Sequence, residues 1–379
     1  MILEQFFSRW LPAHRTFSFW KGRVALYAIL KSLSVREGNE VIVPGYTCVM
    51  GVNPIKYLRA QPIYVDIEPA TYNMNVELLE NKITRRTKVI IAQHTYGYPC
   101  DMDAVMEIAN RYGIAVVEDC CLALGSTYKG KRCGTFGIAS YFSFQWNKPL
   151  TAGLGGMAIV NEPDLAAKID ALCRKECQQP SSKAAFMLSL QRVIHRLLVY
   201  PRSTAFITQL FRWLVKKGMI IGSSSTCEYI PVMVDDFFTS MSISQSNAVL
   251  RQFKKIEDNM AHRRAMQRLY DNLLQEAGWT VPRIPEYIDP VLVRYPVRVE
   301  DKTKVAADSL RCGVEIGTWF ESPLHPKPTP LHLYDYKLGM CPEAEKASRT
   351  VVNLPLHPRA GKITVRRSVE FITNYTQAR

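Results

Sequence analysis

Two ionisable side chains follow apolar segments in positions where a bound ligand could reach them. Asp119 follows the apolar run IAVVE, and Lys148 lies 29 residues later, after the aromatic run YFSFQW. Taken alone, Asp119 would be a helix cap or turn former and Lys148 a solvated loop residue. As a pair at neighbouring strand ends they indicate more. Burial would lower the pKa of the lysine and keep its amine nucleophilic, as Schiff-base chemistry requires.

Glycines close to Lys148 favour a ligand-binding loop. Gly153, Gly155 and Gly156 follow the lysine within eight residues. Glycine lets the backbone turn tightly and approach a ligand closely. The segment 142–160 is therefore predicted to be a strand, a lysine-bearing loop and a second strand.

The pattern of the preceding residues predicts a sheet that would position both groups. Short apolar runs alternate with segments whose apolar residues have helical spacing. The predicted strands are 40–44, 62–67, 88–94, 114–120, 141–144 and 156–160, and the predicted helices are 74–83, 102–113 and 164–176. This alternation predicts a mostly parallel sheet covered on both faces, with ligands at the carboxyl ends of its strands. A long helix from residue 241 and a strand over 291–300 are expected to begin a second domain.

Composition narrows the class of protein. The chain has 379 residues, 47% of them hydrophobic and 22% charged, which favours a folded protein of two domains and excludes disorder. Glu4 and Arg9 interrupt the N-terminal apolar stretch that a signal peptide would have. The cysteines form no CxxC pair and the histidines no HExxH motif, so we expect no metal. These features predict a cytoplasmic enzyme.

Residues 181–218 interrupt the alternation of strands and helices. The net charge of the chain is +14, and from Cys177 to Thr226 there are seven basic residues and no acidic one. Two amphipathic basic helices are expected here. Their apolar faces could pack on the body of the protein or on a partner subunit, or the pair could lie on an anionic membrane surface. Nucleic acid is not expected as a partner, because the chain has no known reader motif.

Seven segments, in order along the chain, resemble one enzyme family. They are WKGRVAL, GNEVIVPGYTC, QPIYVDIEPATYNMN, TKVIIAQHTYGYPCDMDAV, IAVVEDCCLALGSTYKGKRCGTFG, FSFQWNKPLTAGLGG and VVNLPLHPRAG. From about Trp20 to the C-terminus, apart from the basic insert, the chain resembles the DegT/DnrJ/EryC1/StrS sugar aminotransferases. These are fold type I enzymes that use pyridoxal 5'-phosphate (PLP).

The resemblance implies roles for particular residues. Lys148 corresponds to the lysine that binds PLP covalently and shuttles the proton, and Asp119 to the carboxylate facing the pyridine nitrogen. Ser143 corresponds to a phosphate-binding hydroxyl. Gly22 and Arg23 occupy a Gly-Thr position whose backbone N–H groups cradle the phosphate at a helix start.

Other positions depart from the family pattern. Cys48 stands where many members place an aromatic residue that stacks on the cofactor ring. Leu122 replaces a Gln or His, Phe238 an Asn that reaches the neighbouring subunit's phosphate, and Leu154 a Glu. These departures bear on the choice of substrate more than on the cofactor.

Two histidines are the remaining candidates for the site. His94, in the HTYG segment, is a candidate for substrate binding or for a core hydrogen bond. His325, in SPLHPKP, lies where family members bring the small domain towards the substrate. Arg294 and Arg298 alternate onto one face of the predicted strand 291–300, where either could meet the carboxylate of the amino donor, although a role at the surface is favoured.

The resemblance predicts the fold and the reaction. We expect a fold like that of aspartate aminotransferase, with a large PLP-binding domain over 1–240, including the insert, and a small α/β domain over 241–379. The expected reaction transfers an amino group, with L-glutamate as donor, to a keto sugar linked to a nucleotide, in surface polysaccharide or lipopolysaccharide biosynthesis. The expected assembly is a homodimer.

Two alternatives to this reaction are a PLP-dependent sugar dehydratase or deoxygenase and a membrane-surface scaffold protein of the same fold. The known dehydratase branch has a His at the lysine position, so Lys148 speaks against the first. The scaffold would use the basic insert and would lie at the inner face of the membrane.

Overall fold

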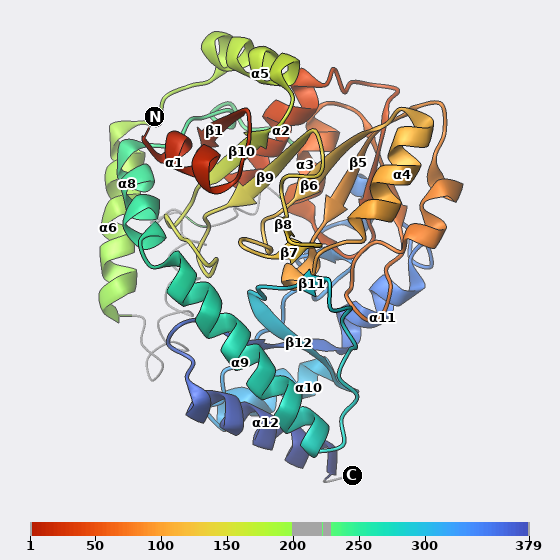
Figure 1. Cartoon of the computed structure of the whole chain (residues 1–379), viewed down its shortest axis with the longest axis vertical. Helices are drawn as coiled ribbons and strands as arrows, with labels where there is room; N and C mark the ends of the chain where they lie inside the picture. The colour runs from red at the N-terminus through yellow and green to blue at the C-terminus, as the bar shows by residue number, and fades with distance from the viewer. Residues whose placement is uncertain (1, 199–221, 223–228, 378–379) are drawn as a thin grey trace.

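A seven-stranded sheet forms the centre of the protein (Figure 1). The structure is a computed structural model that describes residues 2–198, 222 and 229–377. The strand order is β1-β10-β9-β6-β5-β2-β4. The bounds are β1 Arg15–Phe19, β10 Gly156–Val160, β9 Ala139–Ser143, β6 Ala115–Asp119, β5 Thr87–Gln93, β2 Glu40–Pro44 and β4 Gln61–Val65.

The five strands from β4 to β9 run parallel, as the sequence predicts. The pairs β2·β4, β2·β5, β5·β6 and β6·β9 are parallel, whereas β10 is antiparallel to β9 and β1 is antiparallel to β10. The predicted mostly parallel α/β fold is therefore confirmed. The sequence did not predict β1, a five-residue strand that contains only two large apolar side chains.

Helices cover both faces of the sheet. Successive strand residues point to opposite faces, so each strand contributes side chains to two buried layers. Val41 and Val43 pack into one buried cluster with α2, and Ile42 packs into another with α4. The helices of the N-terminal half are α1 Ile2–Trp10, α2 Gly22–Ser32, α3 Val49–Tyr57, α4 Met102–Tyr112, α5 Pro163–Glu176 and α6 Ser182–Leu198. Within the described residues, no helix is both long and apolar enough to cross a membrane.

Two expected helices differ from the structure. The segment 74–83 forms two single turns, η1 Val76–Leu78 and η2 Glu80–Lys82, because the Asn75 side chain accepts from the backbone N–H of Glu77 and caps the first turn. The long helix from residue 241 is divided into α8 (Ile243–Phe253) and α9 (Ile256–Glu276). The second expected basic helix, over 205–217, lies outside the described residues.

The C-terminal part forms the lower half of the molecule in Figure 1. Strands β12 (Arg294–Arg298) and β14 (Val351–Pro355) pair antiparallel, and α9 packs along α12. Its other elements are α10 Lys302–Arg311, η5 Leu331–Tyr334, α11 Pro342–Thr350 and α12 Lys362–Gln377. The division at residue 240 remains a prediction, and α8 packs against α1 and α6.

Two short pairings outside the large sheet join the C-terminal part to the N-terminal part. Strand β11 (Ile288–Asp289) pairs with β7 (Thr127–Tyr128), which in turn pairs with β8 (Lys131–Arg132). Strand β13 (Leu324–His325) runs parallel to β3 (Thr47–Cys48). The second pairing brings the C-terminal part to the carboxyl end of the parallel strands.

Candidate functional site

Asp119 lies at the carboxyl end of β6 with both carboxylate oxygens engaged. The backbone N–H of Cys121 donates to Oδ1 at 2.9 Å, and the hydroxyl of Tyr141 donates to Oδ2 at 2.5 Å. Tyr141 lies on β9 directly opposite Asp119 in the parallel register. The side chain of Asp119 is half-buried, so part of it can meet a ligand.

Lys148 follows β9 in a loop that folds back on itself. The N–H of Phe144 donates to the Gly155 carbonyl at 2.9 Å, and the N–H of Trp146 donates to the Gly153 carbonyl at 3.1 Å. Asn147 has φ 68°, a left-handed conformation that Asn tolerates. These contacts fix the backbone on each side of the lysine.

The amine of Lys148 lies among aromatic, thiol and carboxylate groups. Its Nζ is 5.2 Å from the centroid of the Trp319 ring. Loss of hydration lowers the pKa of Lys148, and the nearby Cys121, Asp119 and Cys48 oppose that shift. A lowered pKa leaves more of the amine unprotonated and able to attack a carbonyl carbon. The structure thus brings Lys148 and Asp119 within one site.

The start of α2 packs against the ends of β9 and β10 through two glycines. A Cβ at Gly156 would lie 2.4 Å from Cα of Gly22, and one at Gly22 would lie 3.1 Å from Cβ of Ser143. The residue before the helix, Lys21, makes no side-chain capping bond to it. The first N–H groups of a helix attract an anion, so this junction next to the Ser143 hydroxyl can hold a phosphate.

This glycine contact predicts that Gly156→Ala impairs both the fold and the phosphate cradle. The added methyl would force α2 away from β10, since 2.4 Å is far below a van der Waals contact. We expect a loss of about 1–3 kcal/mol in stability and a weaker affinity for PLP. Thermal denaturation and equilibrium dialysis with PLP would measure the two. Gly361→Ala is the control, because a Cβ there meets nothing within 4 Å; equal behaviour of the two variants would contradict the cradle.

Cys48 and Arg23 lie together behind the site. Cys48 precedes α3, and burial raises the pKa of its thiol, although Arg23 and Lys148 partly offset the shift. The Arg23 side chain is buried, with Nη1 2.6 Å from Sδ of Met50. Arg23 therefore supplies positive charge near Cys48.

His325 reaches the site from the C-terminal part. It pairs with Cys48 in the β13·β3 register, and burial lowers its pKa to about 4, with Lys302 and Lys148 adding to that shift. Its Nδ1 is buried and has no hydrogen-bond partner among the described residues. A buried nitrogen without a partner costs free energy, so a bound ligand that donates to Nδ1 would satisfy it.

His94 makes core hydrogen bonds, the alternative to substrate binding that the sequence left open for it. Its Nδ1 accepts from the backbone N–H of Cys100, and its Nε2 lies 3.1 Å from Oε2 of Glu118. The ring is fully buried, and the N–H groups of residues 134, 136 and 137 also donate to Glu118. His94, Glu118 and Cys120 lie within 4.8 Å of one another, but these bonds already occupy the first two.

Three of the positions that depart from the family pattern are buried. Phe238 stacks on Phe19 with ring centroids 5.8 Å apart and meets Tyr27 edge-on. Leu122 and Leu154 are also core residues. In this subunit, therefore, Phe238 packs inward.

Helix α6 braces the loop that carries Lys148, a contact that the sequence did not reveal. Its His195 ring lies 4.6 Å from the Trp146 ring, and Leu188 is buried against Gly153. Arg192 donates to the Ala152 carbonyl at 3.3 Å. The large apolar side chains face away from the body, with 43–67% of each exposed: Phe186, Leu190, Val193, Ile194 and Leu197. The alternative in which this face packs on the body of the protein is therefore wrong for α6.

The two arginines of β12 have different surroundings. Arg294 donates to Oε1 of Glu315 at 3.0 Å, and its Cζ lies 5.8 Å from the Trp319 ring, which Lys148 also approaches. Arg298 lies 5.5 Å from the Tyr72 ring instead. Only Arg294 therefore shares an aromatic neighbour with Lys148.

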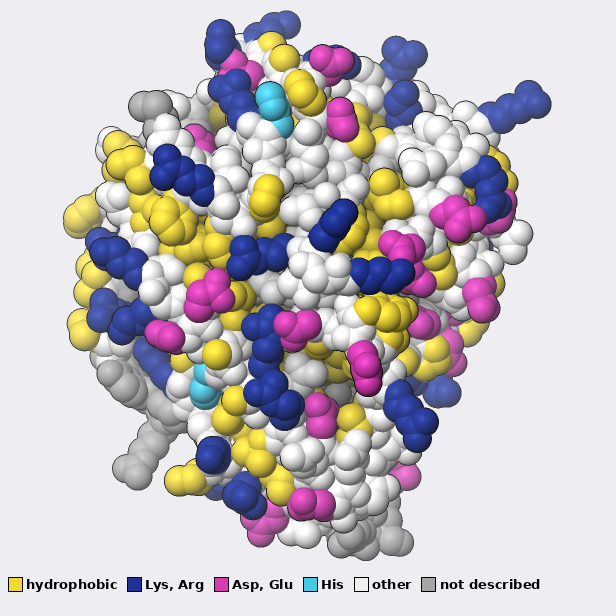
Figure 2. All heavy atoms as spheres, viewed as in Figure 1, with side chains coloured by type: hydrophobic (Ala, Val, Ile, Leu, Met, Phe, Trp, Pro, Cys, Tyr) yellow, Lys and Arg dark blue, Asp and Glu magenta, His cyan; other side chains and the backbone are white. Residues whose placement is uncertain are grey.

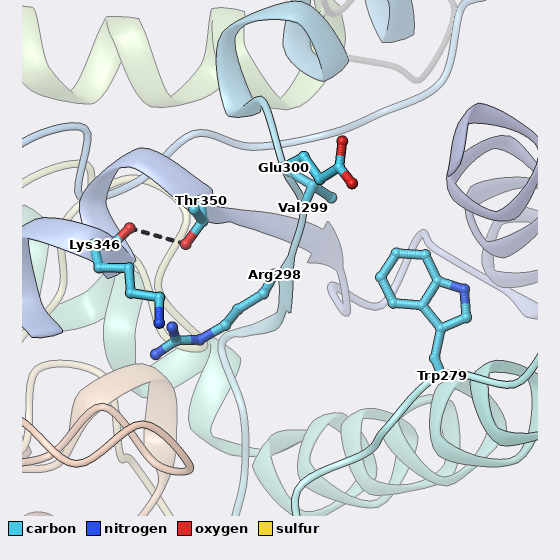
Figure 3. Close-up of a pocket in the computed structure, with 6 residues that line it drawn as sticks. All are labelled: Trp279, Arg298, Val299, Glu300, Lys346 and Thr350. Carbon is cyan, nitrogen blue, oxygen red and sulfur yellow. Dashed lines mark hydrogen bonds between the residues drawn. The ribbon is translucent and has the colours of Figure 1, made fainter. Parts of the chain in front are cut away.

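A shallow surface hollow of about 330 Å³ lies in the C-terminal part (Figure 3). The residues that line it are Trp279, Arg298, Val299, Glu300, Lys346 and Thr350. In Figure 3 the Thr350 hydroxyl donates to the Lys346 carbonyl, at 2.9 Å, and Trp279 lies across the hollow from them. None of the groups around Lys148 lines this hollow, so it is separate from the candidate site.

Comparisons with known proteins identify the family. The model of the DegT/DnrJ/EryC1/StrS aminotransferase family matches residues 2–190 and 237–373, so the chain belongs to that family. A UDP-2-acetamido-2-deoxy-3-oxo-D-glucuronate aminotransferase of Pseudomonas aeruginosa is 29% identical over 373 residues, covering 98% of this chain and 89% of the relative. A GDP-perosamine synthase of Escherichia coli O157:H7 is 49% identical over 144 residues, which are 38% of this chain and 40% of the relative.

Solved structures show the same fold. An aminotransferase from Psychrobacter cryohalolentis matches with a TM-score of 0.77 and 22% identity, over 100% of this chain and 90% of that one. The chain is therefore an aminotransferase of PLP-dependent fold type I.

The residues of the candidate site fit PLP. The site offers a carboxylate for a protonated ring nitrogen, an amine for an aldehyde and a glycine-lined helix start for a phosphate. The partnerless Nδ1 of His325 adds a buried acceptor that the described protein groups do not satisfy. These donors and acceptors match the three polar parts of PLP.

Proposed function

We propose that this enzyme transfers the amino group of L-glutamate to a keto sugar carried on a nucleotide, for surface polysaccharide or lipopolysaccharide biosynthesis. The observation that carries the proposal is the pairing of Lys148, with its lowered pKa, and Asp119 at the carboxyl end of a parallel sheet. In open α/β sheets this edge is where ligands bind. Sugar aminotransferase activity is common to the named relatives.

Each residue of the site has a proposed role. Lys148 would hold PLP through its amine, and that amine would move a proton between the substrate carbon and the cofactor carbon that react. Asp119 accepts a hydrogen bond from the protonated pyridine nitrogen. The Ser143 hydroxyl and the N–H groups of Gly22 and Arg23 hold the phosphate. When bound, PLP supplies the electron sink for the charge that develops on the substrate carbon.

The substrate side of the site is formed by the C-terminal part. His325 stays neutral near pH 7, because its pKa is about 4, so it can exchange hydrogen bonds with a sugar hydroxyl. Cys48, beside it in the strand register, is smaller than the aromatic residue that many family members have at this position. The basic surface would attract the phosphates of a nucleotide sugar.

A two-stage assay tests the function. Incubation with L-glutamate should release 2-oxoglutarate in an amount equal to the PLP present. Addition of a UDP- or GDP-linked keto sugar should then consume that stored amino group and release an amino sugar, as mass spectrometry would show. Release of 2-oxoglutarate without amination of any nucleotide-linked keto sugar would contradict the substrate class. Absence of both stages would contradict the activity.

The alternative of sugar dehydration predicts a different product. A dehydratase would release an unsaturated or deoxygenated sugar and incorporate no nitrogen from glutamate. The lysine of the site favours amination, because the dehydratase branch has a His at that position. ¹⁵N-labelled glutamate separates the two, since only amination transfers the label to the sugar.

The exposed apolar face of α6 favours assembly as a homodimer. Its five large side chains lie on the helix side opposite Leu188 and His195, which brace the lysine loop. Figure 2 shows hydrophobic and basic side chains along the left edge, where Figure 1 places α6. A second copy would bury this face and stand next to the site. The alternative partner of this face of α6 is the anionic inner face of the membrane. The cytoplasmic location of the enzyme remains a prediction.

This surface predicts that Ile194→Glu converts the dimer to a monomer. A buried, unpaired carboxylate at an apolar interface costs several kcal/mol, which would dissociate the copies. Sedimentation velocity would measure the change. Ile363→Glu, at another exposed apolar position, should leave the dimer intact. A monomeric wild type that binds phosphatidylserine vesicles, and loses that binding in Ile194→Glu, would establish the membrane instead.

A further inference from the structure

A tyrosine next to the candidate site makes a short hydrogen bond to the carboxylate of Asp119. The hydroxyl of Tyr141 is 2.5 Å from Oδ2 of Asp119. The two residues lie opposite each other on neighbouring parallel strands, so the backbone register fixes their approach. A hydrogen bond to an ionised acceptor at this distance is charge-assisted and about twice as strong as a neutral one.

Tyr141 acts as a donor in this bond. Only 3% of the residue is exposed, and burial raises its pKa well above the usual value, with the charge of Asp119 adding to the shift. The phenol therefore keeps its proton at any working pH and donates a hydrogen bond to Oδ2 of Asp119. The N–H of Cys121, in the turn after β6, donates to the other oxygen, so this donor and Tyr141 on β9 together set the plane of the carboxylate.

We propose that Tyr141 is a positioning residue, which holds the carboxylate of Asp119 in the orientation that accepts a hydrogen bond from the pyridine nitrogen of PLP. Each oxygen keeps one lone pair free, so the carboxylate can still accept from the cofactor. Because the inference rests on the proposed role of Asp119, its test must separate the failure of one from the failure of the other.

The matched control is a second buried tyrosine away from the site. Tyr64, on β4, is also 3% exposed, and its hydroxyl donates to the Tyr334 carbonyl at 2.8 Å. Replacing either tyrosine with Phe removes one buried hydrogen bond and keeps the ring. Both variants should therefore lose thermal stability, and only Tyr141→Phe should affect the site.

The test measures PLP affinity and the glutamate half-reaction in Tyr141→Phe and Tyr64→Phe. We expect Tyr141→Phe to raise the dissociation constant of PLP about tenfold and to slow the half-reaction about tenfold, whereas Tyr64→Phe changes neither beyond about twofold. Tyr141→Phe with the affinity and rate of the wild type would overturn the proposal. Neither readout needs the sugar, so a wrong sugar substrate would not affect the result.

A double-mutant cycle shows whether Tyr141 acts through Asp119. In an Asp119→Asn background the added Tyr141→Phe change should alter PLP affinity by less than about twofold, because the charged acceptor is already gone. The same tenfold loss in both backgrounds would overturn the proposal by showing that Tyr141 acts through another group. A wild-type protein that does not bind PLP would instead contradict the cofactor role of Asp119.

Discussion

Lys148→Ala should abolish transamination, with a loss of roughly 10³-fold or more in the glutamate half-reaction. The variant lacks the amine that binds PLP and moves the proton, and no other lysine in the described residues is identified at the site. Loss of a half-buried side chain from a loop fixed by backbone hydrogen bonds should leave the fold intact. Borohydride reduction followed by peptide mass spectrometry should attach PLP to the Lys148 peptide in the wild type and to no peptide in the variant.

A chemically matched lysine controls for that result. Lys302 is also buried, with a pKa lowered to about 8, but its amine donates to the carbonyls of Trp319, Phe320 and Ser348. Lys302→Ala should therefore lower the melting temperature and leave PLP attached at Lys148. Covalent PLP at a different lysine in the wild type would show that Lys148 has been assigned the wrong role.

Lys148→Arg separates charge from nucleophilicity. Arginine keeps the positive charge near Asp119 but is protonated at every working pH, so it cannot attack a carbonyl carbon. We expect it to be as inactive as Lys148→Ala, although it can hold PLP without a covalent bond. Substantial activity in the arginine variant would mean that the lysine acts only as a charge.

The sequence predicted the parts of the site that depend on strand order. Asp119 and Lys148 each follow an apolar run, and the carboxyl ends of parallel strands meet at one edge, so their proximity could be expected. The phosphate cradle could also be predicted, because the residue pattern shows a glycine at the start of a helix. Their assigned roles, however, came from the family resemblance and remain predictions.

Other parts of the site depend on contacts between distant segments. Trp319 lies 171 positions after Lys148, and nothing in its local sequence marks it as a neighbour of the amine. Tyr141 could have been found, since it lies on β9, the strand that leads to Lys148, and pairs with Asp119 on the neighbouring strand. His94 is the opposite case. It lies at a strand end, as a ligand-binding residue would, but Glu118 on β6 and the backbone N–H of Cys100 occupy its two nitrogens.

Helix α6 shows why amphipathicity alone does not give orientation. The spacing of Phe186, Leu190 and Ile194 predicted one apolar face, and a helix normally turns such a face inward. The structure places the side with Leu188, Arg192 and His195 on the lysine loop instead. Polar side chains can form that contact because the loop presents backbone carbonyls and an indole ring. Deleting the whole insert would therefore damage the site as well as any docking surface.

Asp119→Asn should give the second-largest loss, about 10²–10³-fold in the rate of the glutamate half-reaction, while PLP still attaches to Lys148. The amide has nearly the shape of the carboxylate, so the fold and the Tyr141 contact region are preserved. It carries no charge, however, and cannot stabilise a protonated pyridine nitrogen. Stopped-flow absorption during mixing with glutamate would measure the rate.

The pattern of losses in Asp119→Asn distinguishes an electronic role from a purely structural one. If Asp119 acts by its charge, the rate falls far more than the affinity for PLP, because the phosphate cradle and Lys148 still hold the cofactor. When the enzyme is reconstituted with a PLP analogue whose ring lacks a basic nitrogen, the half-reaction should be equally slow in the wild type and in Asp119→Asn. With this analogue neither protein can use the carboxylate. If the half-reaction with that analogue were much slower in Asp119→Asn than in the wild type, Asp119 would have a structural role. Its effect would then not depend on a protonated ring nitrogen.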